Sequence, residues 1–227
     1  MAKRYAQYCP VAHALELVGE RWALLVVREL LNGPKRYTDL AAALPGIGTN
    51  ILAGRLRDLE DAGVIQKRQL PPPAAAKVYE LTPYGEELRE PLYALGRWGA
   101  RSLGPPQPDD ALAPGWLVNA VRATCTSGCL PDKVFELRVE DDVVTARFDG
   151  DNQLVVEPGA SDAADTIIET DAQTLFCIAS GQTTTSEAIK TKLLKVAGDR
   201  KDAERFLSFF SFDEPRSGPE SRQLEHV

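Results

Sequence analysis

The chain has 227 residues, of which 44% are hydrophobic and 26% charged, and its formal net charge is −7. This length allows one large domain or two small ones, and no apolar run approaches the roughly 20 residues that span a bilayer, which excludes a membrane-spanning helix. The N-terminal segment MAKRYAQYCPVAHALEL lacks the continuous apolar stretch of a secretory signal, so we expect a cytoplasmic protein.

The two halves of the chain differ in charge. Residues 1–104 hold 14 Lys and Arg against 11 Asp and Glu, a net +3, whereas residues 105–227 hold 12 against 22, a net −10. The segment LGPPQPDDALAPG between them is rich in proline, as linkers are. We therefore expect a first domain over 1–104, a linker over 105–114, a second domain over 115–212 and a flexible tail over 213–227. A mildly basic first domain permits binding to a polyanion.

The first half predicts four helices followed by a hairpin and a closing helix. The helices are expected near residues 11–18, 20–32, 36–43 and 49–62. The turn sequences NGP and LPG end the second and third helices, and Thr49 or Asn50 can cap the fourth. The segments VIQKRQL and KVYELT alternate between apolar and polar residues and are joined by PPPAAA, and the last helix runs from Pro83 to Leu103. This order predicts a winged helix-turn-helix.

The fourth predicted helix has an apolar face and an exposed face. Its leucines fit one buried stripe, whereas Asn50, Ala53, Gly54 and Arg57 fall on the opposite side. Small residues allow a close approach to DNA, and arginines can bond phosphates or a guanine edge. The alternative is a surface helix whose arginines are only solvated, and Arg55 can instead brace its own domain by pairing with a carboxylate.

Basic residues flank the predicted wing. Lys67, Arg68 and Lys77 flank the wing and can contact the DNA backbone or the minor groove. The tip, PPPAAA, has no basic residue. Proline can enter the minor groove as an apolar wedge, but a stiff tip that touches nothing fits equally well.

The second half predicts an α+β sandwich with a mostly antiparallel sheet. A helix in GWLVNAVRATC precedes three alternating strands, KVFELRVE, DVVTARFDG and NQLVVEPG, and a fourth strand lies in ADTIIETD. Helices near 171–180 and 184–190, the short strand LLKVAG and the helix DRKDAERFLSFF complete the order. The whole chain is therefore expected to be of the α+β class.

The first half resembles the HxlR-type family of bacterial transcription regulators, from Cys9 to about Leu103. The stretches that carry the resemblance are CPVAHALELVGERWALLVVRELLNGPKRYTDL, LPGIGTNILAGRLRDLEDAGVI, YELTPYGEEL and LGRWG. The resemblance implies a winged-helix homodimer joined by its first and last helices, with candidate contacts at Leu15, Leu92, Leu95 and Trp98. Trp22 is expected in the core, and Trp98 fits either the core or the dimer contact. The DNA contacts that the resemblance implies are Lys35, Arg36, Thr49, Asn50, Ala53, Arg55 and Arg57, plus the wing.

The second half resembles the sterol-carrier-protein-like fold, most clearly from ADTIIETD to AERFLSFF. The resemblance implies helices over one face of the sheet and an apolar cavity between them. The candidate lining residues are Trp116, Phe135, Leu137, Phe148, Phe176 and Phe210. The alternative is that these side chains simply fill a core, because apolar residues alone do not show an empty space.

The four cysteines suggest one candidate for redox sensing. Cys9 precedes the first predicted helix, and some members of the HxlR-type family sense oxidants or electrophiles through a cysteine at this position. The alternative is a purely structural thiol. Cys125 and Cys129 lack further ligands nearby, so no zinc site is expected, and Cys177 fits the core of a helix.

These observations predict a sequence-specific DNA-binding transcription regulator, a homodimer that responds to a small apolar effector. No nucleophile–base arrangement and no phosphate loop is present, so we expect no enzyme, no cofactor and no metal. The expected partners are double-stranded DNA, a second copy of the chain and a small apolar ligand, with no membrane. The alternatives are a lipid-carrier or enzymatic C-terminal domain fused to a DNA-binding module, a C-terminal domain that only dimerises, and a redox-sensing regulator that acts through Cys9.

Overall fold

The computed structural model describes residues 4–73, 75–107, 110, 112, 115–125 and 128–212. The predicted tail over 213–227 and part of the predicted linker lie outside these residues. The chain divides into two compact units, the first formed by residues 1–96 and 106–122, and the second by residues 97–105 and 123–227. The predicted domain boundaries at 104 and 115 stay a prediction.

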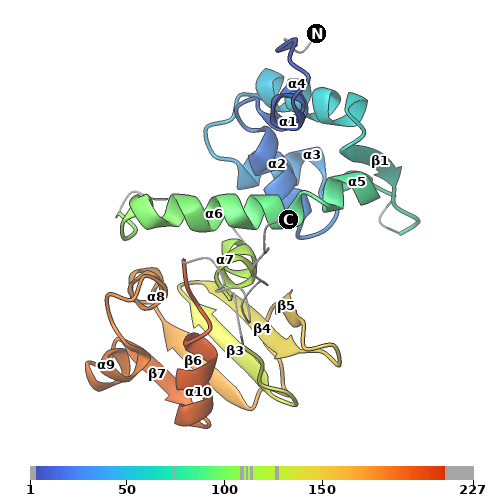
Figure 1. Ribbon diagram of the computed structural model, residues 1–227. Coiled ribbons are helices and arrows are strands. Elements are labelled where there is room, and N and C mark those ends of the chain that lie inside the picture. The colour runs from blue at the N-terminus through green and yellow to red at the C-terminus, as the bar shows by residue number, and fades with distance from the viewer. Residues whose placement is uncertain are drawn as a thin grey trace, which may run out of the picture. The chain divides into compact units, whose positions relative to one another are not determined.

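The first unit is a winged helix-turn-helix, as predicted (Figure 1). Helices α1 (Pro10–Val18), α2 (Ala23–Leu30), α3 (Tyr37–Ala43) and α4 (Thr49–Asp61) precede strands β1 (Ile65–Gln69) and β2 (Lys77–Leu81). The two strands pair antiparallel to form the wing. The stripe of Leu52, Leu56 and Leu59 on α4 is no more than 2% exposed, so this face of α4 packs into the core of the unit.

Two predicted details of the first unit are wrong. Gly48, not Thr49 or Asn50, is the N-cap of α4, because the extended backbone already ends at Gly48 and Thr49 is helical. Trp22 is half-buried rather than in the core, and its left-handed φ of 79° delays the start of α2 to Ala23.

The closing helix, predicted as one, is two helices. Helix α5 (Pro83–Glu86) ends before α6 (Arg89–Leu103) begins. Thr82 caps α5 by accepting a hydrogen bond from the Gly85 N–H, and its hydroxyl donates to the Gly63 carbonyl oxygen at 2.6 Å. These bonds hold α5 against the segment between α4 and β1. Beyond this contact, α6 begins as a separate helix at Arg89. Helix α7 (Trp116–Thr124) follows in the chain.

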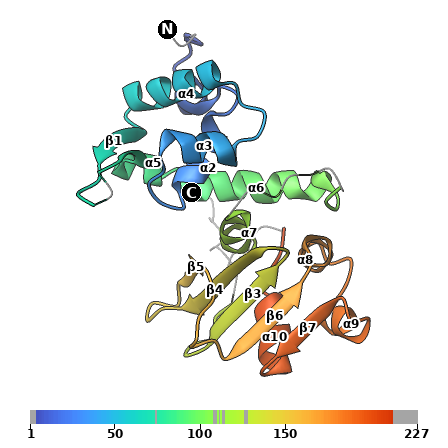
Figure 2. The same ribbon diagram turned by 180° about the vertical axis from the view of Figure 1, so that it is seen from behind.

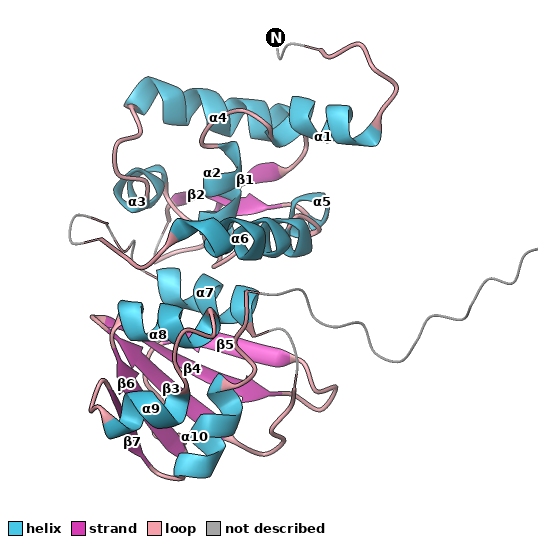
Figure 3. Ribbon diagram, turned by 60° about the vertical axis from the view of Figure 1, so that its left-hand side comes forward, coloured by secondary structure: helices cyan, strands magenta, loops and turns pink. Residues whose placement is uncertain are grey.

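The second unit contains a five-stranded sheet in the order β5-β4-β3-β6-β7. Its strands are β3 (Val134–Val139), β4 (Asp142–Phe148), β5 (Leu154–Pro158), β6 (Thr166–Thr170) and β7 (Leu194–Ala197). Every pair is antiparallel except β3 with β6, which confirms the mostly antiparallel sheet. Helices α8 (Ala172–Ala179), α9 (Thr185–Lys190) and α10 (Arg200–Leu207) lie over one face (Figures 1 and 3). The predicted α+β class is therefore confirmed.

The core of the second unit is aromatic where α10 meets the sheet. The rings of Phe135 on β3 and Phe206 on α10 stack with centroids 4.3 Å apart, and both side chains are fully buried. Phe210 packs edge-on against Phe206 at 5.2 Å. Burying rings of this size contributes strongly to the hydrophobic stabilisation of the unit.

We predict that Gly85→Ala lowers the free energy of unfolding by about 1–3 kcal/mol, because an added methyl group would overlap the carbonyl oxygen of Val64. Urea denaturation of the full chain followed by circular dichroism measures the change. Gly54→Ala on α4 is the matched control, since nothing lies within 4 Å of its added methyl group. That variant should gain about 0.5–1 kcal/mol from helix propensity. Equal stability of the two variants would contradict the proposed contact.

Candidate nucleic-acid interface

Helices α3 and α4 form the helix-turn-helix of the first unit. The turn over 44–48 is closed by a hydrogen bond from the Ile47 N–H to the Leu44 carbonyl oxygen at 3.1 Å. The Tyr37 hydroxyl at the start of α3 donates to the Thr49 carbonyl oxygen at the start of α4, at 2.9 Å. The first turns of both helices are therefore tied together, which fixes the angle at which α4 is presented.

The outward face of α4 matches the one predicted from the sequence in part. Thr49, Asn50 and Arg57 are exposed, and Ala53 and Gly54 are half-buried. In Figures 1 and 2, α4 runs along the outer edge of the first unit beside α1. A helix in this position can enter a DNA major groove with its N-terminal turns.

Lys35, one of the predicted DNA contacts, lies beside a buried carboxylate. Its Nζ lies 3.5 Å from Glu29 Oε2, and the Glu29 carboxylate is only 3% exposed. Arg28 Nη2 lies 2.7 Å from the other carboxylate oxygen. The Lys35 backbone also exchanges two hydrogen bonds with Tyr79 of β2. Lys35 therefore compensates a buried charge and joins the segment before α3 to the wing.

Three more of the predicted contact residues are engaged in ion pairs. Arg55 Nη1 lies 3.0 Å from Asp58 and 3.7 Å from Glu20, and its side chain is 20% exposed. This geometry favours the alternative in which Arg55 braces its own unit. In the wing, Lys67 pairs with Glu60, whose hydrogen bond raises the pKa of Lys67, and Arg68 Nε lies 2.7 Å from Glu80.

Three cations of the predicted set, Arg36, Arg57 and Lys77, have no carboxylate partner among the described residues. Within the described part of the chain, Arg57 on α4 and Lys77 on β2 take part in no ion pair, and both are exposed. Arg36, at the N-cap of α3, is also exposed, and only its backbone N–H contacts a carboxylate, that of Asp39. The predicted set is therefore divided between residues that hold the fold and residues that remain available to phosphates or bases. Sequence reasoning missed Tyr37 and Glu29, which position this set.

The predicted effector-pocket residues are mostly buried. Phe135, Leu137, Phe148 and Phe210 are at most 9% exposed, and Phe176 is half-buried with its ring 5.2 Å from that of Phe212. Trp116 is half-buried and belongs to the first unit. The stacked rings show close packing around Phe135, and a ligand pocket there stays a prediction.

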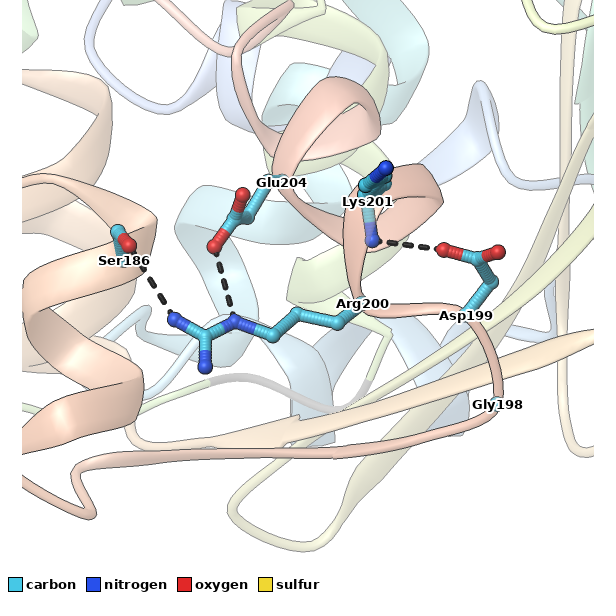
Figure 4. Close-up of a pocket in the computed structure, with 6 residues that line it drawn as sticks. All are labelled: Ser186, Gly198, Asp199, Arg200, Lys201 and Glu204. Carbon is cyan, nitrogen blue, oxygen red and sulfur yellow. Dashed lines mark hydrogen bonds and ion pairs between the residues drawn. The ribbon is translucent and has the colours of Figure 1, made fainter.

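A surface hollow of the second unit has a different lining (Figure 4). Its residues are Ser186, Gly198, Asp199, Arg200, Lys201 and Glu204. Arg200 already pairs with Glu204 at 3.0 Å and donates to Ser186, and Asp199 accepts hydrogen bonds at the N-terminus of α10. The charges that line the hollow are thus largely satisfied by one another.

The cysteines differ in accessibility and environment. Cys9 is the N-cap of α1, is half-buried, and makes no side-chain capping bond. Burial raises the pKa of the Cys125 thiol to about 12, which keeps it protonated at neutral pH. Cys129 lies 3.0 Å from Asn152, and Cys177 is half-buried on α8 rather than in the core. Among the residues described, no group of His, Cys, Asp or Glu has the arrangement of a metal site.

Comparisons with known proteins find two families. Residues 17–107 match the family described as HxlR-like helix-turn-helix, and residues 128–211 match the SCP-2 sterol transfer family. The HTH-type transcriptional regulator sll1512 of Synechocystis is 38% identical over 92 residues, which cover 40% of this chain and 68% of that protein. YodB of Bacillus subtilis, also an HTH-type transcriptional regulator, is 31% identical over 98 residues, 43% of this chain and 88% of YodB.

Solved structures with similarity to the chain include two of YodB. The reduced form of YodB is 30% identical with a TM-score of 0.38, and covers 46% of this chain and all 100% of that one. The quinone-bound YodB is 29% identical with a TM-score of 0.35, and covers 40% of this chain and 97% of that one. None of the described helices has the length and apolar character that crossing a membrane requires.

We predict that Lys35→Met lowers the free energy of unfolding by about 1–3 kcal/mol, because the buried Glu29 carboxylate loses one of its two cations. Arg57→Met is the matched control and should change stability by less than about 0.5 kcal/mol. Urea denaturation of both full-length variants gives the comparison. The double variant Glu29→Leu/Lys35→Met should be more stable than Lys35→Met alone, because no buried charge is left without its cation. A double variant that is less stable than Lys35→Met would rule out the charge explanation.

Proposed function

The chain belongs to the HxlR-like helix-turn-helix family of transcriptional regulators, and on that premise we propose that it binds a specific DNA duplex as a homodimer, with α4 in the major groove. The observation that carries the proposal is the difference in ion pairing between the two arginines of α4. Arg57 is exposed on the same side as Asn50 and Gly54 and has no ion-pair partner in the described residues, whereas Arg55 is held by Asp58. Arg57 is thus free to bond a guanine edge or a phosphate.

The proposed interface combines α4 with the wing. Asn50 can read an adenine edge, and the exposed side chains of Thr49 and Arg36 can bond backbone phosphates. Lys77 offers an unpaired charge on β2, while Lys67 and Arg68 reach DNA only if they exchange their carboxylate partners. We therefore assign Arg57 and Lys77 a larger share of the binding energy than the paired cations.

Exposed apolar residues on α1 and α6 support the proposed dimer. Leu15 is 47% exposed, Leu95 48% and Trp98 69%. Leu92, the fourth candidate contact, is half-buried. Large apolar side chains exposed on two helices are typical of an interface that a second copy covers. A two-fold dimer would place two α4 helices on half-sites about one helical turn apart, roughly 34 Å.

We also propose that the second unit binds a small apolar effector. Its match to the SCP-2 sterol transfer family and its aromatic core support an apolar ligand class. An effector that binds two states of the dimer unequally would change the affinity for DNA. A lipid carrier fused to a DNA-binding module and a purely dimerising second unit are the competing functions, and they predict no coupling between ligand and DNA.

A second candidate signal is oxidation or alkylation of Cys9. The thiol lies at the N-terminus of α1, one of the two helices proposed to form the dimer contact, and it is not used as a helix cap. Chemical modification there would alter the helix that positions the partner copy.

We predict that Arg57→Ala weakens binding to the preferred duplex by about 1–3 kcal/mol if Arg57 reads a base, and by less if it contacts a phosphate. The duplex is first selected from a random pool by the full-length chain, and affinities are then measured by fluorescence anisotropy at fixed salt. Arg205→Ala removes an exposed arginine of α10 and should leave the affinity unchanged. Equal loss on every sequence would exclude base reading, and no binding to any duplex at low salt would contradict the proposed function.

We predict that peroxide or a quinone weakens binding to the same duplex and that Cys9→Ser abolishes this response. Cys129→Ser, a second half-buried thiol, serves as the control and should respond like the unmodified chain. The measurement is anisotropy before and after treatment, with the modified residue identified by mass spectrometry. A Cys9→Ser protein that still responds would make Cys9 a structural residue.

A further inference from the structure

Ile51 is an exposed apolar residue in the first turn of α4. Its side chain is 48% exposed, although its neighbour Leu52 is fully buried. Sequence reasoning assigned it no role, because it belongs neither to the leucine stripe nor to the set of polar residues on the outward face. Single exposed apolar residues are common on protein surfaces, so its exposure alone carries no argument.

The charges along α4 limit where DNA can approach this helix. The residues from Thr49 to Arg57 include no acid, whereas Asp58, Glu60 and Asp61 follow in the last turn. Asp58 and Glu60 are paired with Arg55 and Lys67, whereas Asp61 is exposed and takes part in no ion pair among the described residues. The unpaired Asp61 carboxylate at the C-terminal end of α4 repels phosphates, and the positive end of the helix dipole lies at the opposite end. The duplex is therefore restricted to the N-terminal half of α4, which contains Ile51.

The neighbours of Ile51 have the chemistry of base recognition. At 100° per residue, Asn50, Gly54 and Arg57 form the centre of the outward face, and Ile51 lies on its flank. Nothing lies within 4 Å of where a side chain at Gly54 would begin, so the helix backbone can approach the floor of a groove closely. An apolar branched side chain has no group that bonds a phosphate, so beside Asn50 and Arg57 it is suited to contact base edges.

We infer that Ile51 contacts the 5-methyl group of a thymine in the major groove and so selects an A·T pair within each half-site. This inference rests on the proposed function. Thymine is the base that presents a methyl group in the major groove of unmodified DNA, and apolar side chains recognise it by contact. Asn50 beside it is suited to bond the N6 and N7 atoms of an adenine in the same part of the half-site.

The test compares thymine with deoxyuridine, which lacks only the methyl group. The full-length chain first selects its preferred duplex from a random pool. Each thymine of the half-site is then replaced singly by deoxyuridine, and affinities are measured for the original chain, Ile51→Val, Ile51→Ala and Leu193→Ala. Leu193, 53% exposed in the second unit, is the matched control for the loss of an exposed apolar side chain.

At one thymine, removal of the methyl group should weaken binding of the original chain by about fourfold. Ile51→Ala should bind the thymine and deoxyuridine duplexes equally, Ile51→Val should keep part of the discrimination, and Leu193→Ala should keep all of it. A selected duplex whose thymines are all insensitive to methyl removal, or an Ile51→Ala chain that still discriminates, overturns the inference but leaves the proposed function intact. Failure to select any duplex overturns both.

Discussion

The buried carboxylate of Glu29 is the constraint around which the helix-turn-helix is arranged. A charge that is 3% exposed is tolerated only with cations close by, and these are Arg28 on the same helix and Lys35 after α2. Because the Lys35 backbone pairs with Tyr79, one ion pair connects α2, the entry to α3 and the wing. The orientation of α4 depends on this connection through the Tyr37–Thr49 hydrogen bond.

Ion pairing within the first half also means that its net charge overstates how much positive charge its surface offers to DNA. Several cations that give residues 1–104 their net +3 are neutralised in place by Glu29, Asp58, Glu60 or Glu80. These cations interact mainly with carboxylates of their own unit, so they add little to the positive potential outside it. The field that a polyanion meets is determined by the few cations that have no such partner.

The sequence predicted the fold well because its hydrophobic periodicity and turn residues agree with each other. The leucine stripe of α4, the alternating strands and the NGP and LPG turns each mark where an element lies or ends, so the type and order of the elements could be predicted. Side-chain partners were harder to predict, because ion pairs such as Lys35–Glu29 and Arg68–Glu80 join residues on different elements. The break between α5 and α6 was missed for a similar reason, since it arises from the hydrogen bonds that Thr82 makes to Gly63 and Val64, residues far from it in the sequence. A helical projection would have shown that Ile51 lies off the buried stripe.

The parallel pairing of β3 with β6 has a consequence for how the second unit forms. Strands β3, β4 and β5 pair with sequence neighbours and can assemble as a meander, whereas β6 must return across the whole meander to reach the other edge of β3. Such non-local pairing slows folding, because the chain loses the entropy of closing a long loop before any contact of β6 with β3 compensates for it. Until β6 arrives, that edge of β3 is unpaired and open to association with other chains. Expression at low temperature or with chaperones is therefore expected to favour this unit more than the helical one.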